Sequence, residues 1–172
     1  MEGIVGRILT NLGFKVQCRK LSEEFLSLRF NEQLTIVEDD LQSIDWASET
    51  VLIGHSYGAY ILLHTLATMT LFPGRVLLIS PVLGQAVSGN FQYGMLPPRA
   101  RMLLKMAKHG TFPIPRYLEI HIGANDNSCD PNLAREFASL IATSNIHIIP
   151  GTGHNLSEAY LETVLNTFLY HE

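Results

Sequence analysis

The sequence predicts an α/β protein with three layers, in which a mostly parallel central sheet lies between two layers of helices. Segments with helical periodicity alternate with strand-like segments along the chain, an order that is typical of a parallel sheet with crossover helices. Several strand-like segments, such as residues 50–54 and 75–80, are unbroken apolar runs. Strands of this kind are buried on both faces, because helices cover both sides of a parallel sheet.

The first half of the chain shows both periodicities. Apolar residues repeat at helical spacing from Ile4 to Leu12, and Gly13 follows where a helix stop is expected. Residues 14–19 alternate between apolar and polar, as a short strand does. The elements predicted up to residue 71 are, in order, a helix at 4–12, a strand at 14–19, a helix at 34–44, a strand at 50–54 and a helix at 59–71.

The second half continues the alternation after a long irregular segment. Residues 81–116 contain many Gly, Pro and aromatic residues and follow a strand, so they are predicted to form a lid or a substrate-binding insertion in a single domain of residues 1–172. The other predicted elements are strands at 75–80, 118–123 and 146–151, and helices at 133–141 and 161–169.

Composition narrows the classes of function. The 172 residues carry a net charge of −4 without an aromatic-rich basic stripe, which argues against nucleic-acid binding. Cys18 and Cys129 have no metal-ligand spacing and indicate free thiols in the cytoplasm, and the N-terminus lacks the pattern of a signal peptide. Residues 50–74 contain no charged residue, yet Gly54, Ser56 and Gly58 interrupt them, so we expect a buried strand and helix rather than a membrane span.

Three polar side chains follow three predicted strands. Ser56 follows the strand at 50–54, Asp126 follows the strand at 118–123, and His154 follows the strand at 146–151. Ligands of open parallel sheets bind at the carboxyl ends of the strands, so these residues are expected to meet. A serine on a sharp strand-to-helix turn needs small residues two positions before and after it. Both of these positions around Ser56 are glycines, Gly54 and Gly58. The alternative for Ser56 is a glycine-rich turn of purely structural origin.

These motifs resemble the α/β-hydrolase family, whose nucleophile, acid and histidine follow one another in the same chain order. The match rests on G-H-S-Y-G at 54–58, G-A-N-D at 123–126 and G-T-G-H at 151–154. The resemblance implies that Ser56 is the nucleophile, His154 its general base and Asp126 the acid. It also implies that the N–H of Tyr57 stabilises an oxyanion. A serine hydrolase of this kind cleaves a small-molecule ester or thioester through an acyl-serine intermediate, without a metal or an organic cofactor.

Other residues compete for some of these roles. Asp130 is a possible acid, but it precedes Pro131 and is a good helix N-cap, so Asp126 is preferred. His154 could instead be a surface loop residue. The remaining strand and helix histidines are expected to be packing or hydrogen-bonded residues, namely His55, His64, His121 and His147.

The segment 81–116 offers candidates for substrate contact. Its apolar residues could line an acyl pocket, or they could form a small satellite core beneath a loop; they are Leu83, Phe91, Tyr93, Met95 and Leu96. Five of the twelve basic residues also lie here and favour a solvated face over a site that steers anions; they are Arg99, Arg101, Lys105, Lys108 and Arg116.

The chain departs from the family pattern at its start. Family members carry a strand and a His-Gly-type loop before the first helix, and that loop supplies the second oxyanion N–H. Only residues 1–3 precede the predicted helix at 4–12, so the chain is expected to be an N-terminally truncated α/β-hydrolase with a gap or an altered pairing in its sheet. The alternative function is therefore a catalytically impaired binding protein that lacks half of the oxyanion hole.

Overall fold

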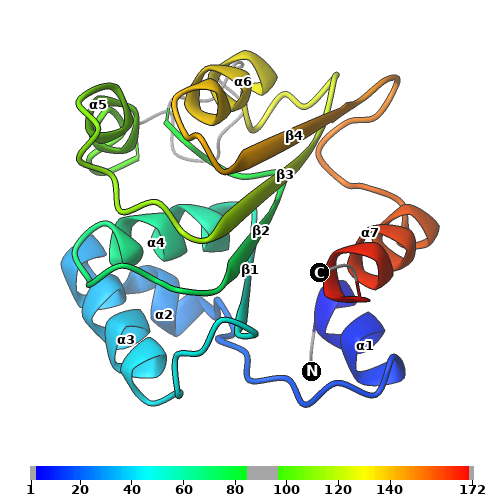
Figure 1. Ribbon diagram of the computed structural model, residues 1–172, viewed down its shortest axis with the longest axis horizontal. Helices are drawn as coiled ribbons and strands as arrows, with labels where there is room; N and C mark the ends of the chain where they lie inside the picture. Colours follow the sequence, from blue (N-terminus) through cyan, green and yellow to red (C-terminus); the bar gives the residue numbers. More distant parts are fainter. Residues whose placement is uncertain (1–2, 85–96, 171–172) are drawn as a thin grey trace.

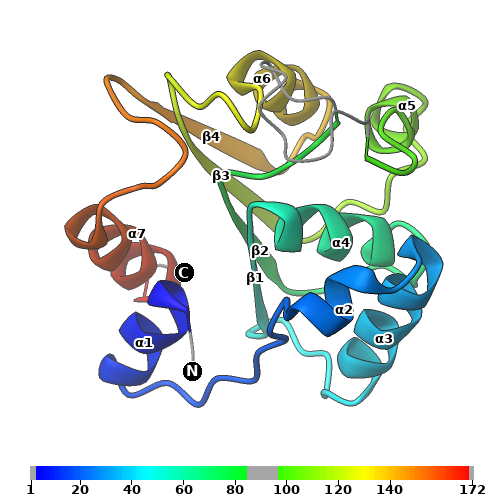
Figure 2. The same ribbon diagram turned by 180° about the vertical axis from the view of Figure 1, so that it is seen from behind.

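A computed structural model of the protein describes residues 3–84 and 97–170. Four parallel strands form one sheet in the order β1-β2-β3-β4, with helices on both faces (Figures 1 and 2). The strands are β1 (Val51–His55), β2 (Arg75–Ile79), β3 (Tyr117–Gly123) and β4 (Ser144–Ile149). The helices are α1 (Ile4–Asn11), α2 (Glu23–Ser27), α3 (Phe30–Gln42), α4 (Tyr57–Leu66), α5 (Met102–Lys108), α6 (Pro131–Ser139) and α7 (Glu158–Tyr170). The predicted α/β architecture is confirmed.

Each face of the sheet has its own hydrophobic core. Leu78, Leu118 and Ile120 point to the face that is covered by α3, α4 and α6. Leu77 and Ile79 point to the opposite face and pack against α1 and α7. The alternation of side chains along each strand explains this division, and burial on both faces explains why the strands are unbroken apolar runs.

The predicted strand at 14–19 is wrong, because this segment is irregular. A strand needs a neighbour for its backbone N–H and C=O groups, and β1 is the terminal strand of the described sheet. The alternation in the sequence instead serves packing: Phe14 and Val16 are half-buried against the core beneath α1 and α7. The ring of Phe14 lies 5.6 Å from the ring of Tyr170.

The helix predicted at 59–71 ends earlier than its apolar sequence indicates. Helix α4 ends at Leu66, and Leu71 is 63% exposed. The chain must return to the start of β2, where Gly74 passes so close to β1 that a Cβ would lie 2.1 Å from the carbonyl oxygen of Thr50. No described helix is long and apolar enough to cross a membrane; α4 has ten residues, whereas a span needs about 20.

The segment predicted as a lid or insertion, 81–116, is described only in part. It contains α5, and Leu83 is buried in the core beside α3 and α4. The five basic residues of this segment are exposed. Arg99 donates a hydrogen bond to Asn31, and Lys108 forms an ion pair with Glu136. The predicted substrate contacts Phe91, Tyr93, Met95 and Leu96 lie outside the described residues.

Candidate active site

Ser56 lies on the tight turn between β1 and α4. Its backbone has φ +52° and ψ −123°, a region that residues other than glycine rarely adopt. Gly54 makes this turn possible, because a Cβ there would lie 2.6 Å from the Cα of Ala59. Gly58 differs from the expectation: a Cβ there would meet only the side chain of Leu21 at 3.7 Å, an ordinary contact.

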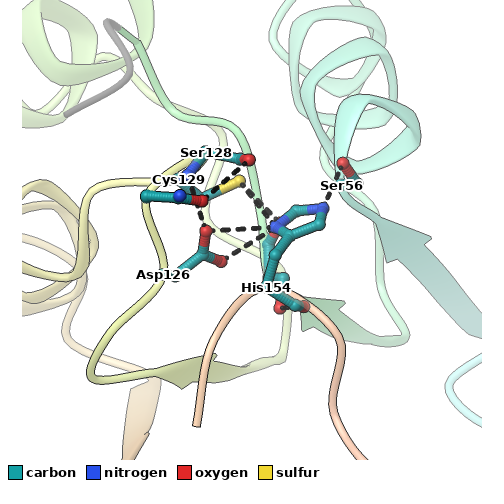
Figure 3. A network of polar contacts seen from close by, with 7 residues as sticks. Ser56, Asp126, Ser128, Cys129 and His154 are labelled. Carbon is teal, nitrogen blue, oxygen red and sulfur yellow. Dashed lines mark hydrogen bonds and ion pairs between the residues drawn. The ribbon is translucent and has the colours of Figure 1, made fainter. Parts of the chain in front are cut away.

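His154 links Ser56 to Asp126 (Figure 3). Its Nε2 lies 3.0 Å from the Oγ of Ser56, and its Nδ1 lies 2.9 Å from Oδ2 of Asp126. The three side chains come from the loops that follow β1, β3 and β4, at the carboxyl ends of the strands. We call Ser56, Asp126 and His154 the strand-end site. In this arrangement the imidazole can exchange a proton with the hydroxyl while the carboxylate holds its other nitrogen.

Asp126 is held in its ionised form by hydrogen bonds. Its side chain is fully buried, and Oδ1 accepts hydrogen bonds of 2.9 Å from the backbone N–H groups of both Ser128 and Cys129. Burial opposes the charge, but the hydrogen bonds from His154 and from these two N–H groups outweigh it and lower the pKa of Asp126. The carboxylate is therefore negatively charged at neutral pH and can orient the imidazole.

Asp130, the alternative candidate for the carboxylate that contacts His154, instead caps a helix. Its Oδ1 accepts a hydrogen bond of 2.8 Å from the N–H of Asn132, and Asp130 is the N-cap of α6. Pro131 occupies the first position of that helix, as the sequence indicates. Of the two aspartates, Asp126 is the one that contacts His154.

Backbone hydrogen bonds join the loop after β3, which carries Asp126 (the acid loop), to the loop after β4, which carries His154 (the histidine loop). The N–H of Ala124 donates to Ile149 and the N–H of Asn125 donates to Thr152, each at 2.9 Å. Gly123 allows this close approach, because a Cβ there would lie 2.2 Å from the carbonyl oxygen of Gly153. The loops that carry Asp126 and His154 therefore form one unit at the ends of β3 and β4.

Ser80 is a residue of this region that the sequence did not reveal. It follows β2, is fully buried, and has a φ of +43°. Its Oγ donates a hydrogen bond of 2.7 Å to the backbone oxygen of His154, and its own carbonyl accepts one from the Cys129 thiol. Ser80 thus connects the histidine loop and the acid loop to the end of β2. The available signal was a serine at the end of an apolar strand, which by itself has many structural explanations.

Two further side chains lie beside the imidazole of His154. The ring of His55, an exposed residue, stacks on it with centroids 6.0 Å apart. The Sγ of Cys129 lies 3.8 Å from Nδ1 of His154. The ligand atoms of Asp126, Cys129 and His154 all lie within 4.8 Å of one another, as in a metal site. Burial and the Asp126 charge raise the pKa of the Cys129 thiol, and a protonated thiol is a poor metal ligand.

Tyr57 is the first residue of α4, next to Ser56. The N–H groups of the first helical turn have no partners within the helix. The side chain packs against the core that contains α3, and its hydroxyl donates a hydrogen bond of 3.0 Å to Gln33. The side chain of Tyr57 is therefore engaged on the side of α3.

Several hydrolases of known structure are similar to this chain. A predicted CIB-like hydrolase from Thermoplasma acidophilum has a TM-score of 0.59 and 16% sequence identity, over 91% of this chain and 67% of that protein. The esterase RhEst1 from Rhodococcus sp. ECU1013 has a TM-score of 0.54 and 13% identity, over 95% and 83%. A monoacylglycerol lipase from Paleococcus ferrophilus has a TM-score of 0.59 and 13% identity, over 84% and 77%. No family model and no curated protein matches the sequence.

Proposed function

We propose that this chain, which has the fold of the α/β-hydrolases, is a serine hydrolase that cleaves a carboxylic ester or thioester through an acyl-Ser56 intermediate. The observation that carries the proposal is the pair of contacts made by His154, with Ser56 on Nε2 and Asp126 on Nδ1. The strained backbone of Ser56 also supports it, because a nucleophile of this fold stands on such a turn.

The chemistry begins with a proton transfer from Ser56. Nε2 of His154 takes the proton as the Oγ of Ser56 attacks the substrate carbonyl carbon, and a tetrahedral oxyanion forms. The N–H of Tyr57 and the positive end of α4 stabilise that negative charge. The imidazolium returns the proton to the leaving alkoxide or thiolate, so the acyl group stays on Ser56. Water, deprotonated by His154, then releases the acid and restores the hydroxyl.

Asp126 acts through His154 in this scheme. Its carboxylate fixes the tautomer that carries the proton on Nδ1, which leaves Nε2 free to accept the proton of Ser56. It also stabilises the imidazolium that forms in the transition state. The lowered pKa of Asp126 keeps it ionised throughout the cycle.

Covalent labelling tests the proposal. A fluorophosphonate probe should label the 172-residue chain at Ser56, as peptide mass spectrometry would locate it, and Ser56→Ala should lose the label. Ser139→Ala is the matched control, since Ser139 is exposed at the end of α6 and does not belong to the strand-end site. A folded chain that takes no label, or that is labelled at another residue, would contradict the proposal.

The second candidate is a binding protein with the fold of a hydrolase and an incomplete oxyanion hole. It is favoured by one observation: β1 is the terminal strand of the described sheet, whereas the family carries a further strand and the second oxyanion N–H on that side. A missing donor costs about 2.7–4 kcal/mol of transition-state stabilisation. Turnover of a p-nitrophenyl ester by the purified chain excludes this candidate, whereas a folded chain without labelling or turnover supports it.

A further inference from the structure

A second group of polar side chains lies on the sheet itself, in the middle of β3 and β4. Glu119 and His121 are two residues apart on β3 and therefore point to the same face. His147 of β4 is the register partner of His121. These residues share the side of the sheet that α1 and α7 cover, where Tyr117 and Ile149 pack. We call Glu119, His121 and His147 the strand-face cluster.

The ligand-type atoms of the strand-face cluster converge. Oε1 of Glu119 lies 2.7 Å from Nε2 of His121 and 3.6 Å from Nε2 of His147, and all three residues have ligand atoms within 4.8 Å of one another. Ligands of a tetrahedral zinc ion, with bonds of about 2.0–2.1 Å, lie about 3.3 Å apart. The distances from Oε1 of Glu119 to the Nε2 atoms of His121 and His147 would each have to change by about 0.6 Å or less to match this ligand spacing.

Hydrogen bonds from neighbouring side chains orient two of these ligands. The hydroxyl of Tyr160, from α7, lies 2.8 Å from Nδ1 of His121, and the hydroxyl of Tyr117 donates to Oε2 of Glu119 at 2.8 Å. These contacts leave Nε2 and Oε1 facing the centre of the cluster. Partners of this kind on the far side of a ligand are usual in metal sites, where they fix ring orientation and tautomer.

The third ligand is the adjustable one. The side chain of His147 is 44% exposed, compared with 4% for His121 and 15% for Glu119. Its ring stacks on that of His121 at an angle of 11°, and its Nε2 accepts a hydrogen bond of 3.1 Å from Asn145. A metal ion would replace this hydrogen bond, and tilting the exposed ring would direct its lone pair to the ion.

The charge balance also favours a cation. Within residues 3–84 and 97–170, the ion-pair partners of Glu119 are the two histidines, and no lysine or arginine pairs with it. The Glu119 side chain is only 15% exposed, and a divalent ion held beside this mostly buried carboxylate would neutralise its charge.

We propose that Glu119, His121 and His147 bind one zinc ion, with a fourth position open to water. Two histidines and a glutamate are a ligand set that zinc accepts in proteins. The site is separate from the strand-end site and does not depend on the proposed hydrolase activity. A zinc ion there would join β4, the outer strand of the described sheet, to β3 through side chains as well as through the backbone ladder.

Zinc titration of the whole chain tests the proposal. After treatment with a chelator, the protein is titrated with ZnCl2 by calorimetry, and one ion per chain is expected. His147→Ala should weaken binding about 100-fold or more, since loss of even a supporting partner typically costs 10–100-fold. Glu119→Gln should also weaken it. The matched control is His109→Ala, because His109 is an exposed histidine at the end of α5, and its affinity should equal that of the native chain.

A second comparison separates this cluster from the other group with metal-like spacing, Asp126, Cys129 and His154. His154→Ala should retain the zinc ion. Thermal unfolding gives an independent readout: zinc should raise the Tm of the native chain but not that of His147→Ala, whose Tm without zinc also reports its folding. The proposal is overturned if the native chain binds no zinc, if His147→Ala binds it equally well, or if His154→Ala is the variant that loses it.

Discussion

Two carboxylate–histidine groups are positioned by β3 and β4, one in the loops that follow these strands and one on the strands themselves, and they are built in different ways. The strand-end site collects side chains from three loops, and Ser56 and His154 are 98 residues apart. It depends on the strained backbone at Ser56 and Ser80 and on the glycine contact between two loops. The strand-face cluster is brought together by the alternation of side chains along β3 and by the register between β3 and β4.

The arrangement, more than the residue types, separates the chemistry of the two groups. At the strand-end site the two nitrogens of His154 have unlike partners, a carboxylate and a hydroxyl, which suits the transfer of a proton along one direction. In the strand-face cluster two histidine nitrogens face the same carboxylate oxygen, which suits a cation at their centre. The comparison predicts that substitutions in the strand-end site abolish hydrolysis but not zinc binding, and that substitutions in the strand-face cluster do the reverse.

The largest expected effect is the loss of hydrolysis in His154→Ala. Without the imidazole, nothing takes the proton of Ser56, and we expect kcat for a p-nitrophenyl ester to fall by about 10^5-fold or more. Initial rates at substrate saturation measure it, and His109→Ala serves as the control. A residual rate within a factor of about ten of the native chain would remove His154 from the mechanism.

Asp126→Asn is expected to have the next largest effect. The amide cannot hold the tautomer in which Nδ1 carries the proton, and kcat should fall by about 10^4-fold with the fold intact. Asp130→Asn is the matched variant, because asparagine also caps helices well, and its kcat should stay close to the native value. If the two variants exchanged these outcomes, the acid would be Asp130.

The sequence predicted the parts of this molecule that depend on local pattern. The apolar segments that form β1 and β2 could be identified because both faces of those strands are buried. Asp130 could be assigned as the N-cap of α6 because Pro131 follows it. The predicted strand at 14–19 failed because alternation does not reveal whether a partner strand is present. The strand-face cluster was missed for a related reason, since it requires the register of His121 with His147.

A further histidine, His64, shows what a buried imidazole without a carboxylate partner costs in stability. It is fully buried in α4, and neither ring nitrogen has a hydrogen-bond partner among the described residues. Burial, followed by the charge of Arg99, lowers the pKa of His64 from 6.5 to about 4. The unfolded chain therefore binds a proton as the pH falls below about 6.5, while the folded chain does not until about 4. Folding loses stability over this range, by about 2–3 kcal/mol in total.

His64→Leu should remove this pH dependence. The free energy of unfolding, from urea titrations at pH 7 and pH 4.5, should fall less in the variant than in the native chain. At pH 7 the variant should be more stable by about 1–3 kcal/mol, because two unpaired polar atoms leave the core. An equal fall in both proteins would mean that His64 is hydrogen-bonded or protonated in the folded chain.

The smallest effect expected is that of Ser80→Ala, which tests whether the strand-end site depends on its loops. The variant removes the hydrogen bond from Ser80 to the backbone of His154, a bond worth about 0.5–1.5 kcal/mol. If Ser80 positions His154, kcat should fall about tenfold with little change in KM, because the lost precision affects the transition state more than substrate binding.

The matched control for Ser80→Ala is Ser157→Ala. Ser157 lies three residues beyond His154 and its hydroxyl accepts from the N–H of Tyr160, so the variant alters the start of α7 without touching the backbone of His154. It should lose some stability and keep its kcat. The strand-face cluster should also keep its affinity for zinc in Ser80→Ala, because the ligands of that cluster are held by strand register. A Ser80→Ala variant with native kcat would show that the joined loops after β3 and β4 hold His154 without β2.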